Sequence, residues 1–257
     1  MRKLFSFLEN LIFKKWFNPF SSLYLNFRLC SFKDAIRFPI SVWGGVTICR
    51  SQGKISFADV CHRGMVRIGR TPGHFFAESR KCFFLLDPNT EIVIGGNVVI
   101  GTGVSIRLTN EAVLELNDGC VLGDNVNIMC EKHISIGRNT VVTFESRIID
   151  TNFHYIIDIE SQVIIRKNHD ILIGANNWIC NNTTIMKGTV TPNNCIVASL
   201  SLLNKDYGNE ENVIIAGAPA KIVRRNKKRL FRCDNPIVTE DELNLYFKKT
   251  SDNCYKL

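Results

Sequence analysis

The sequence contains no long hydrophobic run, and this absence restricts the classes of protein to which it can belong. No apolar stretch approaches the roughly 20 residues that a transmembrane helix needs. The first residues also lack a clean apolar segment followed by a small-residue cleavage site, so we expect no signal peptide. The ten cysteines are scattered and lack the paired spacing of a metal site. This cysteine usage fits a reducing cytoplasm and predicts no bound metal.

Acidic residues are in deficit, with 24 Asp and Glu against 32 Lys and Arg, which gives a net charge of +8. A basic surface is typical of proteins that contact nucleic acid, anionic lipid or a phosphate-bearing small molecule. Nucleic acid is the weakest of these options, because aromatic residues do not interleave with the main basic run at 221–232. A run of this kind is ordinarily a solvated helix face. The hydrophobic content of 45% is sufficient for a folded core.

What the sequence does contain is a period of six residues, and it is clearest between Ile173 and Leu203. This period belongs neither to an α-helix nor to an ordinary strand, and it is typical of a hexapeptide-repeat β-helix. Each unit is a short strand and a corner, and three units close one coil. Asn or Gly recurs at the corners because these residues accept positive φ. The aliphatic column is Ile173, Ile179, Ile185, Val197 and Leu203, with Thr191 as its one polar member, and the corner residues are Asn176, Asn182, Gly188 and Asn194.

The same pattern divides the chain into three parts. Residues 40–206 should form the β-helix, whose earlier inward column is Ile94, Ile100, Leu116, Leu122 and Ile136. The repeat stops for about 24 residues, which leaves a long loop at 149–172, and loops of this length are usually functional. Residues 207–257 should hold a basic segment and one short helix at 240–248.

Residues 1–39 carry no hexapeptide pattern and are expected to be helical. Apolar residues recur at helical spacing within the first 17 positions, which predicts a helix there. Asn18-Pro19 should end this helix. One interpretation is a helix that covers the open end of the β-helix. The alternative is a basic amphipathic helix that rests on the inner membrane.

Three motifs, in order, resemble the hexapeptide acyltransferases, and more narrowly the maltose, galactoside and xenobiotic acetyltransferase group with its relatives in surface-polysaccharide synthesis. The motifs are Asp150-Thr-Asn-Phe-His154, IGANNWICNNTTIMKG at 173–188, and NKD at 204–206 followed by IAGAPAKIVR at 215–224. The resemblance implies an all-β fold: a left-handed parallel β-helix with short N- and C-terminal helical additions. It also implies homotrimers with active sites between neighbouring chains, and acetyl-CoA as the co-substrate. The chain departs from the family pattern at Asn177, Cys180, Thr191-Pro192 and Ala198–Leu200.

The resemblance also assigns chemical roles. A hydroxyl group has a pKa far above 7, so its attack on a thioester needs a base, and histidine suits that task. His154 is the predicted base, and Asp150 is predicted to orient the imidazole or a sugar hydroxyl. By their positions in the motifs, the residues expected to meet the pantetheine arm are Asn181, Ala198 and Ser199, and those expected to meet the CoA phosphates are Lys205, Lys221 and Arg224.

We therefore predict a cytoplasmic enzyme that transfers an acetyl group from acetyl-CoA to a sugar hydroxyl in capsule or lipopolysaccharide synthesis. Acetylation of an amino sugar is an alternative, since the same base would serve. A non-catalytic β-helix scaffold at the membrane surface is another. A zinc hydro-lyase of the carbonic anhydrase type would need three converging histidines, whereas His133, His154 and His169 include no close pair.

Overall fold

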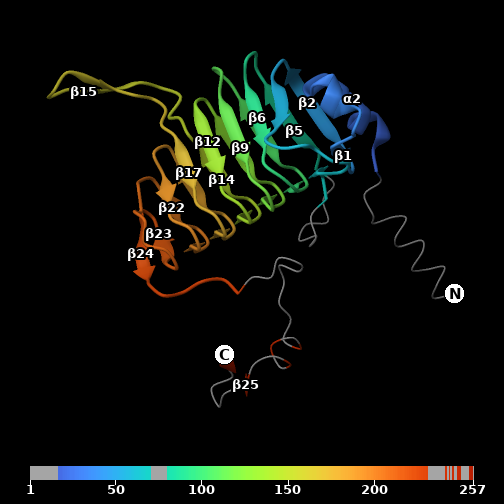
Figure 1. The fold of residues 1–257 in the computed structure, drawn as a ribbon. Helices are drawn as coiled ribbons and strands as arrows, with labels where there is room; N and C mark the ends of the chain where they lie inside the picture. The colour runs from blue at the N-terminus through green and yellow to red at the C-terminus, as the bar shows by residue number, and fades with distance from the viewer. Residues whose placement is uncertain are drawn as a thin grey trace.

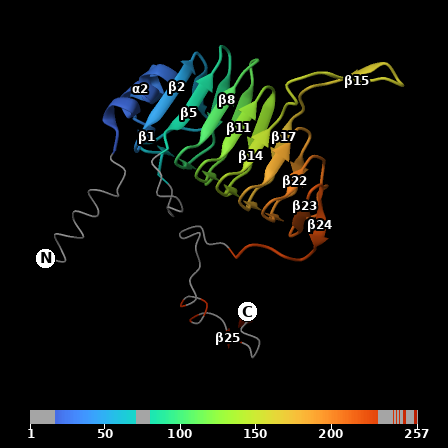
Figure 2. The same ribbon diagram turned by 180° about the vertical axis from the view of Figure 1, so that it is seen from behind.

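Three parallel β-sheets form the faces of a triangular prism, along which the chain winds from one end to the other (Figures 1 and 2). The structure is a computed structural model that describes residues 17–70 and 80–230, together with a few single positions beyond residue 240. Consecutive strands enter consecutive sheets, so each coil visits every face once. The predicted β-helix is confirmed.

The sheets are named here by their number of strands. Sheet 1 has nine strands, in the order β1 (Ile40–Val42), β4 (Val66–Ile68), β7 (Val98–Ile100), β10 (Val121–Leu122), β13 (Val141–Val142), β18 (Trp178–Ile179), β21 (Ile196–Val197), β23 (Ile214–Gly217) and β24 (Ala220–Arg224). Sheet 2 has seven, β2 (Val46–Ser51), β5 (Cys82–Leu86), β8 (Ser105–Leu108), β11 (Asn127–Cys130), β14 (Arg147–Ile149), β19 (Thr184–Met186) and β22 (Leu202–Leu203). Sheet 3 has six, β3 (Lys54–Phe57), β6 (Glu91–Ile94), β9 (Val113–Leu116), β12 (His133–Ile136), β17 (Ile171–Ile173) and β20 (Val190–Thr191).

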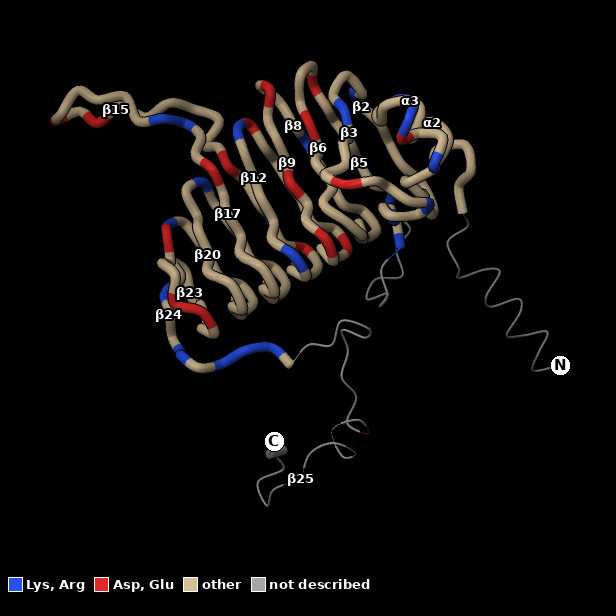
Figure 3. Tube along the Cα trace, viewed as in Figure 1, with Lys and Arg blue, Asp and Glu red and all other residues tan. Residues whose placement is uncertain are grey.

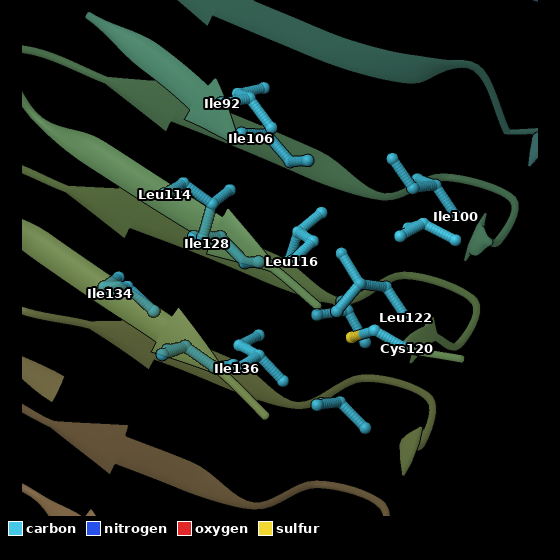
Figure 4. Close-up of a cluster of buried hydrophobic side chains, with 14 of the residues drawn as sticks. Ile92, Ile100, Ile106, Leu114, Leu116, Cys120, Leu122, Ile128, Ile134 and Ile136 are labelled. Carbon is cyan, nitrogen blue, oxygen red and sulfur yellow. The ribbon is translucent and has the colours of Figure 1, made fainter. Parts of the chain in front are cut away.

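The interior of the prism is filled by ladders of aliphatic side chains from all three sheets (Figure 4). Parallel pairing in register stacks Ile94 on Leu116, Leu116 on Ile136, and Ile136 on Ile173. All of the inward columns predicted from the period of six are buried. Each such aliphatic side chain contributes about 1.5–3 kcal/mol when it leaves water, so the repeat itself supplies most of the stability.

The corners of the prism take the predicted Asn/Gly conformation. Asn176, Asn182 and Asn194 have φ between 56° and 57°, and Gly188 has φ 77°. At Gly137 a Cβ atom would lie only 2.6 Å from the backbone nitrogen of Ala175 in the next coil, so close stacking of the coils requires glycine there. These residues therefore serve the fold.

The three corners are named by the sheets that they join. Corner 1–2 contains residues 123–126, 143–146, 180–183 and 198–201. Corner 2–3 contains residues 131–132, 150–170, 187–189 and 204–206. Corner 3–1 contains residues 117–120, 137–140, 174–177 and 192–195.

Two helices cover the N-terminal end of the prism: α2 (Pro19–Leu29) and α3 (Phe32–Ala35). Asn18 caps α2 by accepting a hydrogen bond from the Ser21 backbone N–H, and Pro19 occupies the first turn. The Asn18-Pro19 pair therefore starts a helix. The helix predicted before Asn18 lies outside the described residues. None of the helices that the structure describes is long and apolar enough to cross a membrane.

The C-terminal part differs from the expectation of a solvated basic helix. Its first basic residues lie on β24, which pairs antiparallel with β23 through a tight turn at Gly217–Ala220 with a cis Ala218-Pro219 bond. Residues 225–230 then run without regular structure. Most of the helix predicted at 240–248 lies outside the described residues; β25 (Lys248–Lys249) and β26 (Tyr255–Lys256) form a separate antiparallel pair.

Candidate functional site

The loop predicted at 149–172 forms an arm that projects from corner 2–3 (Figures 1 and 2). The arm is a hairpin of two antiparallel strands, β15 (Ile156–Asp158) and β16 (Val163–Ile165). Its base is held by Lys167, whose ammonium lies 2.9 Å from a Glu131 carboxylate oxygen, and by the Thr151 hydroxyl, which donates to that same oxygen. The arm therefore leaves the prism from an ordered base.

His154, the predicted base, lies at the start of the arm and is exposed. No residue among those described hydrogen-bonds to its imidazole. Either ring nitrogen is thus available to a substrate hydroxyl, as a general base requires. The imidazole does not lie in an enclosed site within the single chain.

Asp150 has a different position from the one expected of a residue that orients His154. Its side chain is fully buried, and its carboxylate accepts the backbone N–H groups of Glu131 at 2.8 Å, Lys132 at 2.8 Å and His133 at 3.1 Å. Burial raises the pKa of the Asp150 carboxyl, against the opposite effect of these donors. The geometry assigns Asp150 to the turn between β11 and β12, where it connects successive coils.

Three of the residues predicted to meet CoA come together at corner 1–2. The Ser199 hydroxyl donates to the Asn181 side-chain oxygen at 2.7 Å, one coil apart, and Ala198 follows the neighbouring strand β21. The tight turn after β23 is adjacent, because the Gly217 N–H donates to the Ser201 hydroxyl. This corner thus offers a small polar surface at the C-terminal end of the prism.

The three predicted phosphate contacts do not form one cluster. Lys205 lies at corner 2–3, near the arm, with its ammonium 5.5 Å from the centre of the Tyr207 ring. Lys221 and Arg224 lie on β24 at the edge of sheet 1, and both side chains are exposed. All three are accessible to an anion, Lys205 from corner 2–3 and the other two from the edge of sheet 1.

The three histidines required by the zinc alternative are also separated. His133 lies on the outer face of sheet 3, 3.3 Å from a Glu115 carboxylate oxygen, while His154 is on the arm. His169 packs beside Gly188 at corner 2–3. Within residues 17–70 and 80–230, no group of three His, Cys, Asp or Glu side chains is arranged to hold a metal ion.

Comparison with known proteins places this architecture in a family. No protein-family model matches the chain. The protein named "Putative lipopolysaccharide biosynthesis O-acetyl transferase WbbJ" of Escherichia coli K12 is 28% identical over 142 residues, which cover 52% of this chain and 71% of that protein. "Putative colanic acid biosynthesis acetyltransferase WcaF" of the same strain is 30% identical over 131 residues, or 51% of this chain and 68% of that protein. The chain belongs to the hexapeptide-repeat acyltransferases.

As a member of this family the chain is an O-acetyltransferase, and its parallel β-helix is the fold that the resemblance implied. One solved structure similar to it is the polysialic acid O-acetyltransferase OatWY, with 24% identity and a TM-score of 0.40; the match covers 80% of this chain and 94% of that one.

Sequence reasoning missed one residue near corner 1–2, Arg229. Its guanidinium lies 5.2 Å from the centre of the Trp178 ring on the outer face of sheet 1, and burial lowers its pKa. The Lys227 N–H donates to the Asn212 carbonyl and fixes the segment there. The basic run gave no signal for this contact, because only the fold brings residue 229 onto Trp178. This segment thus places a further cation close to Cys180.

Proposed function

We propose that this O-acetyltransferase moves an acetyl group from acetyl-CoA to a sugar hydroxyl during the synthesis of a surface polysaccharide. The exposed His154 imidazole, held at the base of an ordered arm, is the observation that carries the proposal. The relatives named for lipopolysaccharide and colanic acid biosynthesis support the choice of a sugar acceptor.

The proposed reaction is a direct transfer. His154 removes the proton from the sugar hydroxyl as the oxygen attacks the thioester carbonyl carbon of acetyl-CoA. The tetrahedral oxyanion is stabilised by a backbone N–H, and the CoA thiolate then leaves and receives the proton from the imidazolium. Asn181, Ala198 and Ser199 bind the pantetheine arm, and the charges of Lys205, Lys221 and Arg224 bind the phosphates. No metal is needed for any of these steps.

We also propose that the working form is a closed homotrimer. His154 at corner 2–3 and Asn181 at corner 1–2 are separated by the full width of sheet 2, so one chain does not bring base and predicted cofactor residues together. If the arm of one copy lies against corner 1–2 of the next copy, His154 of the first copy meets the predicted cofactor residues of the second. The composition of the arm supports this packing, because both of its faces expose aliphatic side chains: Ile156, Ile157, Val163, Ile164 and Ile165.

The outer face of sheet 1 supplies the second argument for a trimer. Parallel pairing places outward-facing apolar side chains in one uninterrupted ladder, Val99, Val121, Val141, Trp178, Ile196 and Ile214. The corresponding outer face of sheet 3 carries charged residues, since Val113 is flanked by Glu91 and His133. Val121→Arg should therefore dissociate the trimer in light scattering, and Val113→Arg should leave it intact. A monomeric wild-type chain at micromolar concentration would contradict the trimer.

We place the enzyme in the cytoplasm, in contact with a membrane surface. Free thiols at seven described positions support a reducing compartment: Cys30, Cys49, Cys61, Cys120, Cys130, Cys180 and Cys195. We propose the membrane contact because the N-terminal part of the sequence is basic.

Acetyl-CoA turnover against a panel of sugars tests the reaction. We expect release of free CoA and a product heavier by one acetyl group, whose acetyl is removed by mild alkali because it is an ester. A product stable to alkali would indicate N-acetylation of an amino sugar instead. Absence of CoA release with every acceptor, together with no CoA binding, would favour the non-catalytic scaffold.

A further inference from the structure

The buried face of helix α2 carries two polar and two apolar residues, while its exposed face is largely aromatic and aliphatic. Ser22, Leu25, Asn26 and Leu29 face the prism. The Asn26 side chain donates to the Ile40 carbonyl at 2.8 Å and accepts the Ile40 N–H at 3.0 Å, and the Ser22 hydroxyl accepts the Val42 N–H. These bonds satisfy the free edge of β1. The helix therefore closes the end of sheet 1, and its other face points away from the prism.

That other face is an aromatic and aliphatic stripe that nothing covers within the described residues. Phe20, Leu23, Tyr24 and Phe27 recur at helical spacing, with exposed fractions of 83%, 49%, 48% and 46%. A helix that closes the end of a soluble prism normally directs such a stripe inward. Here the stripe is directed outward, which indicates a further apolar contact.

The stripe continues onto α3 and the neighbouring loop. The Phe27 ring lies 6.3 Å from that of Phe32 and 5.9 Å from that of Phe38, measured between centroids. The complete set is named here the N-terminal apolar surface: Phe20, Leu23, Tyr24, Phe27, Phe32, Ile36 and Phe38. Scattered apolar residues are ordinary on a surface, but a contiguous apolar patch marks a binding site.

Exposed basic side chains lie on the same two helices as this surface. They are Arg28 on α2 and Lys33 on α3, whereas the acidic Asp34 on α3 is engaged by the Ser31 hydroxyl and by Arg37. Figure 3 shows basic positions on both α2 and α3. Aromatic side chains combined with Lys and Arg are the composition of protein surfaces that sit at the interface of an anionic bilayer.

We propose that the N-terminal apolar surface docks the enzyme end-on to an anionic lipid bilayer. This inference rests on the trimer of the proposed function, because a cyclic trimer of parallel prisms places all three copies of the surface on one side. Three weak contacts made together bind far more strongly than one. In Figure 1, α2 lies at one end of the prism and β24 at the other, so docking leaves corners 1–2 and 2–3 accessible from the side. The acceptor class that fits is a sugar chain held on a lipid anchor.

Co-sedimentation of the full chain with vesicles tests the docking. Wild type should bind vesicles of phosphatidylglycerol and phosphatidylethanolamine, bind phosphatidylcholine vesicles far more weakly, and lose binding as salt rises. Phe20→Glu with Leu23→Glu should weaken binding by at least about tenfold, since each removes an inserted apolar side chain. Lys33→Glu should weaken it by about fivefold or more. The matched control is Leu172→Glu, an exposed apolar position on sheet 3, which should bind as wild type.

Two results would overturn the docking. Wild type that stays in the supernatant with every vesicle would mean that the surface is covered by another occupant, such as residues 1–16, a second copy or a protein. Vesicle binding unchanged in the Phe20→Glu and Leu23→Glu variant would place the contact elsewhere. Turnover with a soluble acceptor keeps the two proposals separate. Normal turnover without vesicle binding refutes only the docking, and vesicle binding without turnover refutes only the reaction.

Discussion

Replacement of Asp150 separates a structural role from a catalytic one. The buried carboxylate accepts three backbone N–H groups in the turn between β11 and β12. An N–H left without a partner costs about 1–3 kcal/mol when buried. Because Lys132 is exposed and its two neighbours are half-buried, water can replace some of the hydrogen bonds that the substitution removes. We therefore expect Asp150→Ala to lower the free energy of unfolding by about 3 kcal/mol.

Asp150→Asn should fall between wild type and Asp150→Ala, because the amide keeps one acceptor oxygen. The assay is urea unfolding followed by circular dichroism, at one protein concentration because the chain is expected to be a trimer. A matched control is Asp118→Ala in corner 3–1, whose carboxylate accepts the Asn97 N–H at 2.7 Å. It should cost about 1 kcal/mol. Turnover per folded enzyme should stay near wild type in Asp150→Asn.

The sign of the pH dependence gives a second check on Asp150. Burial raises the folded-state pKa of this carboxyl, so the folded chain binds the proton more tightly than the unfolded chain does. Wild type should therefore gain stability relative to Asp150→Asn as pH falls through the folded-state pKa, until the unfolded value of about 3.9 is passed. If Asp150→Asn kept wild-type stability but lost a hundredfold in turnover, the residue would act in catalysis and the structural assignment would be wrong.

The remaining predictions concern the site itself. His154→Ala should lower turnover by about 10²–10⁴-fold without changing CoA affinity, measured by steady-state kinetics and calorimetry; near wild-type turnover would exclude His154 as the base. Lys221→Ala and Arg224→Ala should weaken CoA binding and keep most of the turnover at saturation, and the reverse profile would remove them from the phosphate site. Leu200 has φ 61°, so Leu200→Asn should stabilise the chain by about 1 kcal/mol in urea unfolding, and a destabilised variant would contradict the backbone argument.

Two local features of the fold carried sequence signals that were missed. Asn18 followed by Pro19 is a helix start, because Asn caps an N-terminus and Pro suits the first turn. The loop at 149–172 holds two short apolar runs, 156–157 and 163–165, on either side of a polar turn, which is the pattern of a hairpin. The strong period of six on either side of the loop suggested an interruption and not an element. The apolar spacing before Asn18 suggested that Asn18-Pro19 ends a helix and not that it starts one.

The role of Asp150 could not have been found from its motif. An acidic residue four positions before a catalytic histidine suggests an orienting partner, but its carboxylate is used by residues 131–133, one coil earlier. Such contacts depend on which residues the coils bring into register. Prediction therefore succeeded where period alone decides, in the inward columns and the Asn/Gly corners. The sequence carried no signal for contacts in which a side chain joins two coils, as Asp150 does.

The arrangement of the site follows from counting residues along the regular coils. Three six-residue units complete one coil, so residues 18 apart lie at the same corner, as Asn181 and Ser199 do. The same count groups Lys187 with Lys205 at corner 2–3. Lys187 donates to the Arg166 carbonyl of the arm, so this second corner is also the corner of His154. The residues predicted from the motifs to form one site thus lie at two corners of one prism. In a cyclic trimer, each of the three contacts between neighbouring copies would bring those two corners together.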